Sequence, residues 1–199
     1  MTGWERMDEA VAYGRTLWQG ERVQLRTMTS ADIEATIPWW LDPAWAVLQQ
    51  NQLRPQNPDE ARELLTRWGR GADASGCGFS IVTHDGEFVG HFTLYGAKLP
   101  VRCATFAIQI APEHVGRGYG SDASRLALRY AFDELGLNRV ELRAWAFNER
   151  AIAAYRKAGF VEEGRRRSVG FHEGRFQDEV LMAVLAEEWR ATRASEVAP

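Results

Sequence analysis

The sequence has few of the features that mark exported, membrane or metal-binding proteins. Its 199 residues contain only two cysteines, Cys77 and Cys103, and these are not spaced as a CxxC pair. We therefore expect neither a disulfide framework nor a metal site, and a reducing cytoplasm suits the chain best. No run of about 18 apolar residues occurs, and the first residues include Glu5, Asp8 and Glu9. Export and membrane insertion are therefore not expected.

A strong excess of one charge is also lacking. The formal net charge is -3 and the pI is about 5.9, which gives no general attraction for nucleic acid or for an anionic membrane. The basic run "GRRRS" at 164–168 is short, and we expect it to be the solvated face of a strand or loop. The length and the 45% hydrophobic content suit one globular domain.

Hydrophobic periodicity predicts a mixed order of strands and helices. An amphipathic helix is expected at 4–18, before the main fold, where it would cover a core edge or the partner subunit of a homodimer. The other expected elements are a strand at 22–28, helices at 29–37 and 57–69, an antiparallel meander over 78–110, a helix at 123–135, a strand at 139–145, a helix at 149–158, and a hairpin over 160–185 that turns at 172–174.

This order indicates an α/β (α+β) fold, in which a mixed, mostly antiparallel sheet carries helices on both faces. Pro38 is expected to end the helix that starts near residue 29. The chain divides into a helical extension at 1–19, one main domain at 20–189 and a frayed tail at 190–199.

The stretch "EHVGRGYGSD" at 113–122 has glycine at alternate positions, Gly116, Gly118 and Gly120. Glycine is needed where the backbone turns unusually or where a ligand leaves no room for a Cβ atom. Because a helix follows, its free N–H groups and its dipole favour an anion such as phosphate. The stretch lacks the lysine of a Walker A loop, and the preceding meander does not suit a dinucleotide-binding βαβ fold.

The stretch resembles the pyrophosphate loop of the GNAT superfamily of N-acetyltransferases, in which Gln or Arg is followed by two residues, Gly, one residue, and Gly or Ala. Val115 departs from this pattern, because the family prefers Arg or Gln there. The resemblance implies that backbone amides of the loop bind the pyrophosphate of coenzyme A and that Arg117 adds positive charge. The implied binding residues are Val115, Gly116, Arg117, Gly118, Tyr119, Gly120 and Ser121.

A second motif, "NERAIAAYRKAGF" at 148–160, also resembles the family. Asn148 has two readings, as the N-cap of its own helix and as a cofactor contact. Tyr155 would line a core if only its helix face were considered. The resemblance implies instead that Tyr155 points at the cofactor sulfur and protonates the departing thiolate.

The family also separates two neighbouring strands to admit the pantetheine arm, and this resemblance implies a splayed pair at 102–110 and 139–145. Backbone groups of Ile108 and Ile110 would then pair with pantetheine amides. Similarity to the ribosomal-protein alanine acetyltransferase branch covers about 20–189.

Acyl transfer to an amine also requires a proton acceptor, because an amine with a pKa of about 10.4 is almost entirely protonated at neutral pH. Glu141, Glu113 and His91 are candidates, of which Glu141 is preferred, and a chain of water molecules would serve equally well. Neither cysteine lies in a nucleophile context, so direct attack by the amine is expected.

The acceptor is expected opposite the cofactor, near large aromatic side chains that would enclose an apolar or cationic amine or pack in a core. Acidic residues in the same region would also allow a polyamine as the acceptor. The aromatic residues are Trp39, Trp40, Trp45, Tyr95 and Phe171, and the acidic ones are Asp42, Asp59 and Glu60.

We therefore expect an acetyl-CoA-dependent N-acetyltransferase that acts on a small-molecule amine. A protein N-terminal (alanine) acetyltransferase and a non-catalytic acyl-CoA-binding module are the alternatives.

Overall fold

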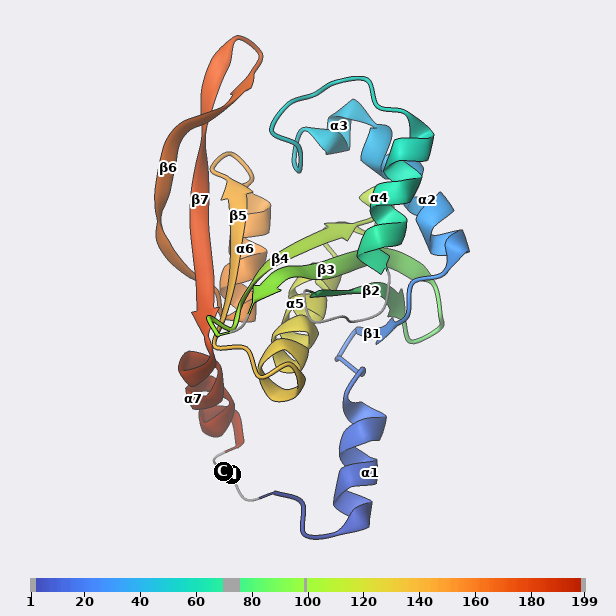
Figure 1. Ribbon diagram of the computed structural model, residues 1–199, viewed down its shortest axis with the longest axis vertical. Coiled ribbons are helices and arrows are strands. Elements are labelled where there is room, and N and C mark those ends of the chain that lie inside the picture. Colours follow the sequence, from blue (N-terminus) through green and yellow to red (C-terminus); the bar gives the residue numbers. More distant parts are fainter. Residues whose placement is uncertain (1–2, 70–75, 99, 198–199) are drawn as a thin grey trace.

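The centre of the protein is a seven-stranded sheet with the order β1-β2-β3-β4-β5-β7-β6 (Figure 1). The computed structural model describes residues 3–69, 76–98 and 100–197. All neighbouring strands are antiparallel except β4 and β5, which are parallel. The strands are β1 (Val23–Arg26), β2 (Gly76–Thr83), β3 (Phe88–Lys98), β4 (Cys103–Ile110), β5 (Arg139–Trp145), β6 (Val161–His172) and β7 (Arg175–Leu185).

Helices cover both faces of this sheet, as the sequence predicted. The helices are α1 (Met7–Thr16), α2 (Ser30–Leu41), α3 (Pro43–Ala46), α4 (Pro58–Gly69), α5 (Tyr119–Arg129), α6 (Glu149–Ala158) and α7 (Ala186–Val197), with a 3-10 turn η1 (Pro112–His114) and a π-helical turn η2 (Tyr130–Glu134). Figure 1 shows β6 and β7 as a long hairpin that extends past the other strands, while α1 projects from the opposite end. The predicted mixed, mostly antiparallel fold is confirmed.

The two faces of the sheet bury different kinds of side chain. One face carries an aromatic row, in which Phe92 lies 5.4 Å from Phe79 and 5.8 Å from Phe106 between ring centroids. This row belongs to the main core, which α5 and α6 complete. On the other face a smaller core between α2 and α4 includes Ile37 and Leu65. Ser80, His91 and Gln109 are cross-strand neighbours that face this side and are also buried, so the second face carries polar groups beside its helices.

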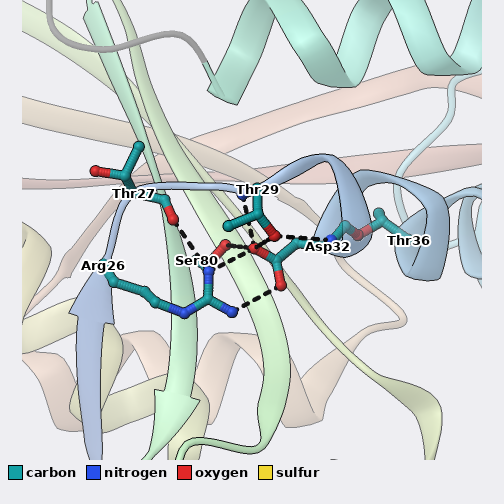
Figure 2. A network of polar contacts seen from close by, with 6 residues as sticks. All are labelled: Arg26, Thr27, Thr29, Asp32, Thr36 and Ser80. Carbon is teal, nitrogen blue, oxygen red and sulfur yellow. Dashed lines mark hydrogen bonds and ion pairs between the residues drawn. The ribbon is translucent and has the colours of Figure 1, made fainter.

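Helix α2 is fixed to the sheet by one buried carboxylate, that of Asp32 (Figure 2). Asp32 accepts hydrogen bonds from Arg26 at 2.6 and 2.8 Å, and its Oδ2 also accepts from the Ser80 hydroxyl at 2.9 Å. Thr29 donates its amide and its hydroxyl to the same oxygen, each at 2.7 Å, which completes a capping box at the start of the helix. The network thus joins β1, β2 and α2.

These donors decide the charge of Asp32. Burial alone would raise the pKa of this carboxyl, but the hydrogen bonds from Arg26, Thr29 and Ser80 outweigh burial and hold the pKa well below its usual range. Asp32 is therefore ionised at neutral pH.

The sequence predicted that Pro38 would end α2, and this prediction was wrong. The helix continues to Leu41, although Pro38 has no N–H to donate. The side chains of Ile37 and Trp40 are buried on either side of it, and Asp42 donates its N–H to the Pro38 carbonyl at 3.0 Å. Burial of this turn against α4 offsets the lost hydrogen bond. Helix α3, which follows directly, was not predicted.

The segment after about residue 190 was expected to be frayed, whereas α7 continues to Val197. The helix contacts the rest of the protein, because the Trp189 ring lies 6.1 Å from that of Phe132 and Arg193 pairs with Asp133 at 2.7 Å. These contacts explain why a polar segment with weak periodicity is helical.

Helix α1 forms where the sequence predicted it, but none of its residues is buried. Tyr13 donates a hydrogen bond to Glu134, and Arg129 donates to the Thr16 carbonyl at 2.9 Å. Its apolar residues Met7 and Val11 are exposed. A role of α1 in a homodimer stays a prediction.

Over the described ranges, no helix combines the length and apolar character that crossing a membrane requires.

Replacing Asp32 by Asn should lower the free energy of unfolding by about 2 kcal/mol at pH 7, because buried donors lose a charged acceptor. Since folding lowers the pKa of Asp32, its stabilisation is present above the unfolded pKa of about 3.9 and is lost as pH falls below it. Urea unfolding of both proteins between pH 3 and 7 measures this. A difference that stays constant with pH would contradict the assignment.

Candidate functional site

Strands β4 and β5 separate after a short paired segment. They pair only at Cys103↔Arg139, Ala104↔Val140 and Thr105↔Glu141. Beyond this point β4 continues along β3 to Ile110, while β5 continues along β7 to Trp145. The splayed pair that the sequence predicted is therefore present.

The open edge of β4 faces this gap. Ala111 donates its N–H to the Val89 carbonyl on the β3 side at 2.9 Å. Because backbone groups alternate in direction along a strand, those of Ile108 and Ile110 point the other way, toward the gap. An extended ligand could pair with them as an added strand does.

A cavity of about 870 Å³ lies at the gap. It brings together most of the residues that the sequence assigned to cofactor binding, from β4, from the loop before α5 and from α6. These lining residues are Ile108, Ile110, Val115, Gly116, Gly118, Tyr119, Gly120, Ser121, Asn148 and Tyr155. The volume and the mixture of apolar walls with a few polar groups are typical of a small-molecule site.

The glycine loop has a backbone that only glycine adopts easily. Gly116 and Gly118 both have φ of +84°, and Gly118 is the N-cap of α5. No side chain caps this helix, so its first N–H groups remain available to an anion. Gly120 is different, because it lies inside the helix and a Cβ there would meet Ile110 at an ordinary 3.6 Å.

The direction of α5 is set by Asp122, whose role the sequence analysis missed. Its carboxylate is only 2% exposed and accepts backbone N–H groups of Arg22 at 2.7 Å and Val23 at 3.1 Å. It thereby ties the first turn of α5 to the start of β1. An acidic residue in a first helical turn is a common feature, so no local pattern distinguishes this contact.

Helix α6 presents two predicted residues to the cavity. The Asn148 side chain accepts the Ala151 N–H at 3.3 Å, so it caps the helix and also lines the cavity. The Tyr155 ring packs edge to face on Phe106 and Phe160, at 6.4 and 5.8 Å. Burial raises the pKa of Tyr155 to about 12, so its hydroxyl keeps its proton at neutral pH.

The sheet face opposite α5 contributes a polar floor. His91 and Gln109 are cross-strand partners on β3 and β4, are 4% and 5% exposed, and both line the cavity. No described residue pairs with His91 Nδ1 or Gln109 Oε1. Burial lowers the pKa of His91 to about 4, so the ring is neutral at pH 7. Buried polar atoms are normally hydrogen-bonded, so these two are available to hydrogen-bond a ligand in the cavity.

Three of the residues predicted for proton transfer or cofactor binding do not line this cavity, namely Glu141, Glu113 and Arg117. Glu141 lies where β4 and β5 are still paired, before the gap opens, and its carboxylate accepts Arg139 Nε at 2.9 Å. Glu113 and Arg117 are exposed on the loop. The preference for Glu141 as proton acceptor is therefore not supported by the position of its side chain.

The aromatic residues predicted near the acceptor divide into two groups. Trp40, Trp45 and Tyr95 line the cavity. Trp39 instead stacks on Phe88 at 5.6 Å, and Phe171 packs on Phe176 at 5.1 Å near the end of the β6–β7 hairpin. The acidic residues Asp42, Asp59 and Glu60 do not line it.

Several lining residues were not predicted as part of the site. Gln109 could have been found, because it is a polar residue within the apolar strand "ATFAIQI". The others depend on strand pairing or loop position, which the sequence alone does not give. These others include Arg54, Trp68, Arg143, Trp145, Arg150, Lys157 and Glu179. Among the described residues, no cluster of three potential metal ligands occurs.

A family model described as "Acetyltransferase (GNAT) domain" matches residues 22–161. The chain is 34% identical over 173 residues to a spermidine N(1)-acetyltransferase of Escherichia coli, with 86% of each chain covered. It is also 32% identical over 151 residues to a putative ribosomal N-acetyltransferase of Bacillus subtilis, covering 75% of this chain and 80% of that protein.

A solved structure gives the same result. The spermidine N-acetyltransferase of Vibrio cholerae, determined in complex with CoA and spermine, superposes with a TM-score of 0.75 at 27% identity. The match covers 84% of this chain and 98% of that one.

Replacing Gly120 by Ala should weaken coenzyme A binding about tenfold while leaving the melting temperature unchanged or slightly raised. The added methyl fits the helix and contacts Ile110, yet it enters the cavity beside the free N–H groups. Calorimetric titration with coenzyme A measures the affinity. Gly14→Ala is the matched control, since Gly14 is also helical and faces open space. Equal affinity of the Gly120→Ala variant and the natural protein for coenzyme A would contradict the assignment of the loop to the binding site.

Proposed function

Because this chain belongs to the GNAT acetyltransferase family, we propose that it transfers an acetyl group to the primary amine of a small molecule. The protein is an N-acetyltransferase, and acetyl-CoA supplies the acetyl group as a thioester. The cavity at the gap between β4 and β5 carries this proposal, because it is open to the glycine loop on one side and to the polar floor on the other. The relatives named for spermidine support a small-molecule acceptor.

The donor half of the cavity would hold coenzyme A mainly through backbone groups. The first N–H groups of α5, beside Gly118 and Gly120, would bind the pyrophosphate. The outward-facing backbone groups of Ile108 and Ile110 would pair with pantetheine amides. Val115 lines the cavity, where its backbone can contribute although its side chain cannot donate a hydrogen bond. Arg117 would add positive charge from the exposed side of the loop.

The reaction moves two protons, because the amine must lose one and the departing sulfur must gain one. We assign Tyr155 as the acid, since its raised pKa keeps the hydroxyl protonated and its ring lies in the cavity. His91 replaces Glu141 as the proposed acceptor of the proton that the amine nitrogen loses once the neutral amine has bonded to the acetyl carbon, because that nitrogen is then far more acidic than a free ammonium. Its ring is neutral, buried and unpaired at Nδ1, and Gln109 beside it offers an unpaired oxygen to an amine N–H.

The purified protein should release thiol from acetyl-CoA in the presence of an amine, measured with a thiol reagent over a panel of small amines and N-terminal peptides. Tyr155→Phe should lower kcat about a hundredfold without changing the affinity for coenzyme A, because only the proton donor is removed. Unchanged kcat in this variant would reject the assignment of Tyr155. Thiol release with peptides alone would replace the small-molecule acceptor by a protein N-terminus.

Replacing His91 by Gln should lower kcat/KM at least about tenfold at pH 7, since a neutral proton acceptor is lost. In the natural protein kcat/KM should rise with pH from 5.5 to 9 as the amine loses its proton, with no inflection near 6.5, because burial keeps the pKa of His91 near about 4. An inflection near 6.5 that disappears in His91→Gln would show an ordinary, solvated histidine and contradict this picture.

A further inference from the structure

The charges and aromatic walls of the cavity restrict the acceptor further. We use the name acceptor chamber for the half bounded by Trp40, Trp68, His91, Gln109, Trp145 and Glu179. We infer that this chamber takes a primary monoamine with an aromatic or apolar body, rather than a polyamine. The inference rests on the proposed function and adds the class of its acceptor.

Glu179 is the carboxylate that reaches the chamber. It lies on β7 directly opposite Trp145 of β5, so the two side chains share one face of the sheet. Glu179 is 6% exposed, and its Oε2 accepts Arg166 Nη1 at 2.9 Å. No described residue donates to its Oε1. The pair is electrically neutral as a whole, yet it leaves one oxygen for a single amine N–H.

The remaining charged groups on the cavity wall are cationic in the part of the chain that the structure describes. Arg150 and Lys157 both belong to α6, and the Arg150 guanidinium lies 5.9 Å from the centre of the Trp45 ring, which also lines the cavity. Arg143 lies two residues before Trp145 and therefore on the same face of β5. Arg54 reaches the cavity from the segment before α4. A second or third ammonium of a polyamine would meet these cations and be repelled.

None of the three carboxylates that the sequence left open for a polyamine, Asp42, Asp59 and Glu60, lines the cavity, and two of them have partners elsewhere. Asp42 accepts the Ala44 N–H at 2.9 Å and caps α3. Asp59 forms an ion pair with Arg62, which also pairs with Glu34. These groups support helices outside the cavity and do not add negative charge to the chamber.

The walls of the chamber suit an aromatic or apolar body. Trp40 and Trp68 meet edge to face at 5.3 Å, and Trp68 lies 6.4 Å from the His91 ring. On the opposite wall Trp145 is only 3% exposed, because Gly170 of β6 makes room for it. A Cβ at position 170 would come within 2.3 Å of the indole. Rigid aromatic surfaces on two sides favour a flat, apolar acceptor beside one polar anchor.

The test compares kcat/KM for phenethylamine, butylamine, putrescine and spermidine by thiol release. The natural protein should use phenethylamine at least about tenfold better than spermidine, because the chamber offers one acceptor oxygen and several like charges. Arg166→Gln should raise kcat/KM for spermidine about tenfold relative to phenethylamine, since it leaves the charge of Glu179 unpaired. Arg165→Gln is the matched control, because Arg165 is exposed and pairs with Glu162 away from the chamber.

The outcomes separate this inference from the proposed function. Spermidine as the better substrate of the natural protein would overturn the inference and leave the N-acetyltransferase intact. Thiol release with none of the amines, in protein that binds coenzyme A, would overturn both. Circular dichroism melts of the Arg166→Gln and Arg165→Gln variants establish that each is folded, and the comparison of substrates with the natural protein needs no variant.

Discussion

The separation of β4 from β5 is the constraint on which the rest of the site depends. Parallel neighbours normally stay paired along their length, but here pairing stops at Thr105 and Glu141. Each strand keeps its other partner, so the sheet remains continuous on both sides of the gap. The gap exposes backbone groups of β4 on one side and brings the polar floor close to the donor half. A fully paired sheet of the same residues would have neither.

Two buried carboxylates hold the helices on either face of this divided sheet. Asp122 fixes the start of α5 to the chain before β1, and Asp32 fixes the start of α2 to β1 and β2. Both lie at helix N-termini, but they bind different partners there. Asp122 turns its charge toward backbone N–H groups outside the helix, which leaves the glycine loop free for an external anion. Asp32 instead completes the capping box of its own helix, so the N-terminus of α2 is already occupied by side chains of the protein.

Local chemistry explains which parts could be predicted. The glycine loop, the helix capped by Asn148 and the hairpin turn at 172–174 are determined by neighbouring residues, and their positions were correct. Helix α2 was cut short because its extension past Pro38 depends on burial against α4, which is distant in sequence. Glu141 was preferred as a proton acceptor because it lies on the correct strand. Which end of that strand borders the gap depends on pairing with β4, and no local pattern encodes it.

The acceptor half was the least predictable for the same reason. Glu179 enters the chamber through its pairing with Trp145 across β5 and β7, and His91 and Gln109 meet across β3 and β4. Gln109 is unusual within its apolar strand and His91 was a candidate proton acceptor, but no single strand shows that these residues and Glu179 meet at one cavity.

The close approach of Trp145 to Gly170 has a consequence for how the acceptor preference of such a protein can change. The indole that forms one wall of the chamber rests on the bare backbone of an edge strand, at a position that does not itself line the cavity. A side chain gained at that edge would push the ring inward and narrow the space for the acceptor, while the glycine loop and β4 stayed as they are. The breadth of substrates is thus adjustable from the outer surface of the sheet, independently of the chemistry at its centre.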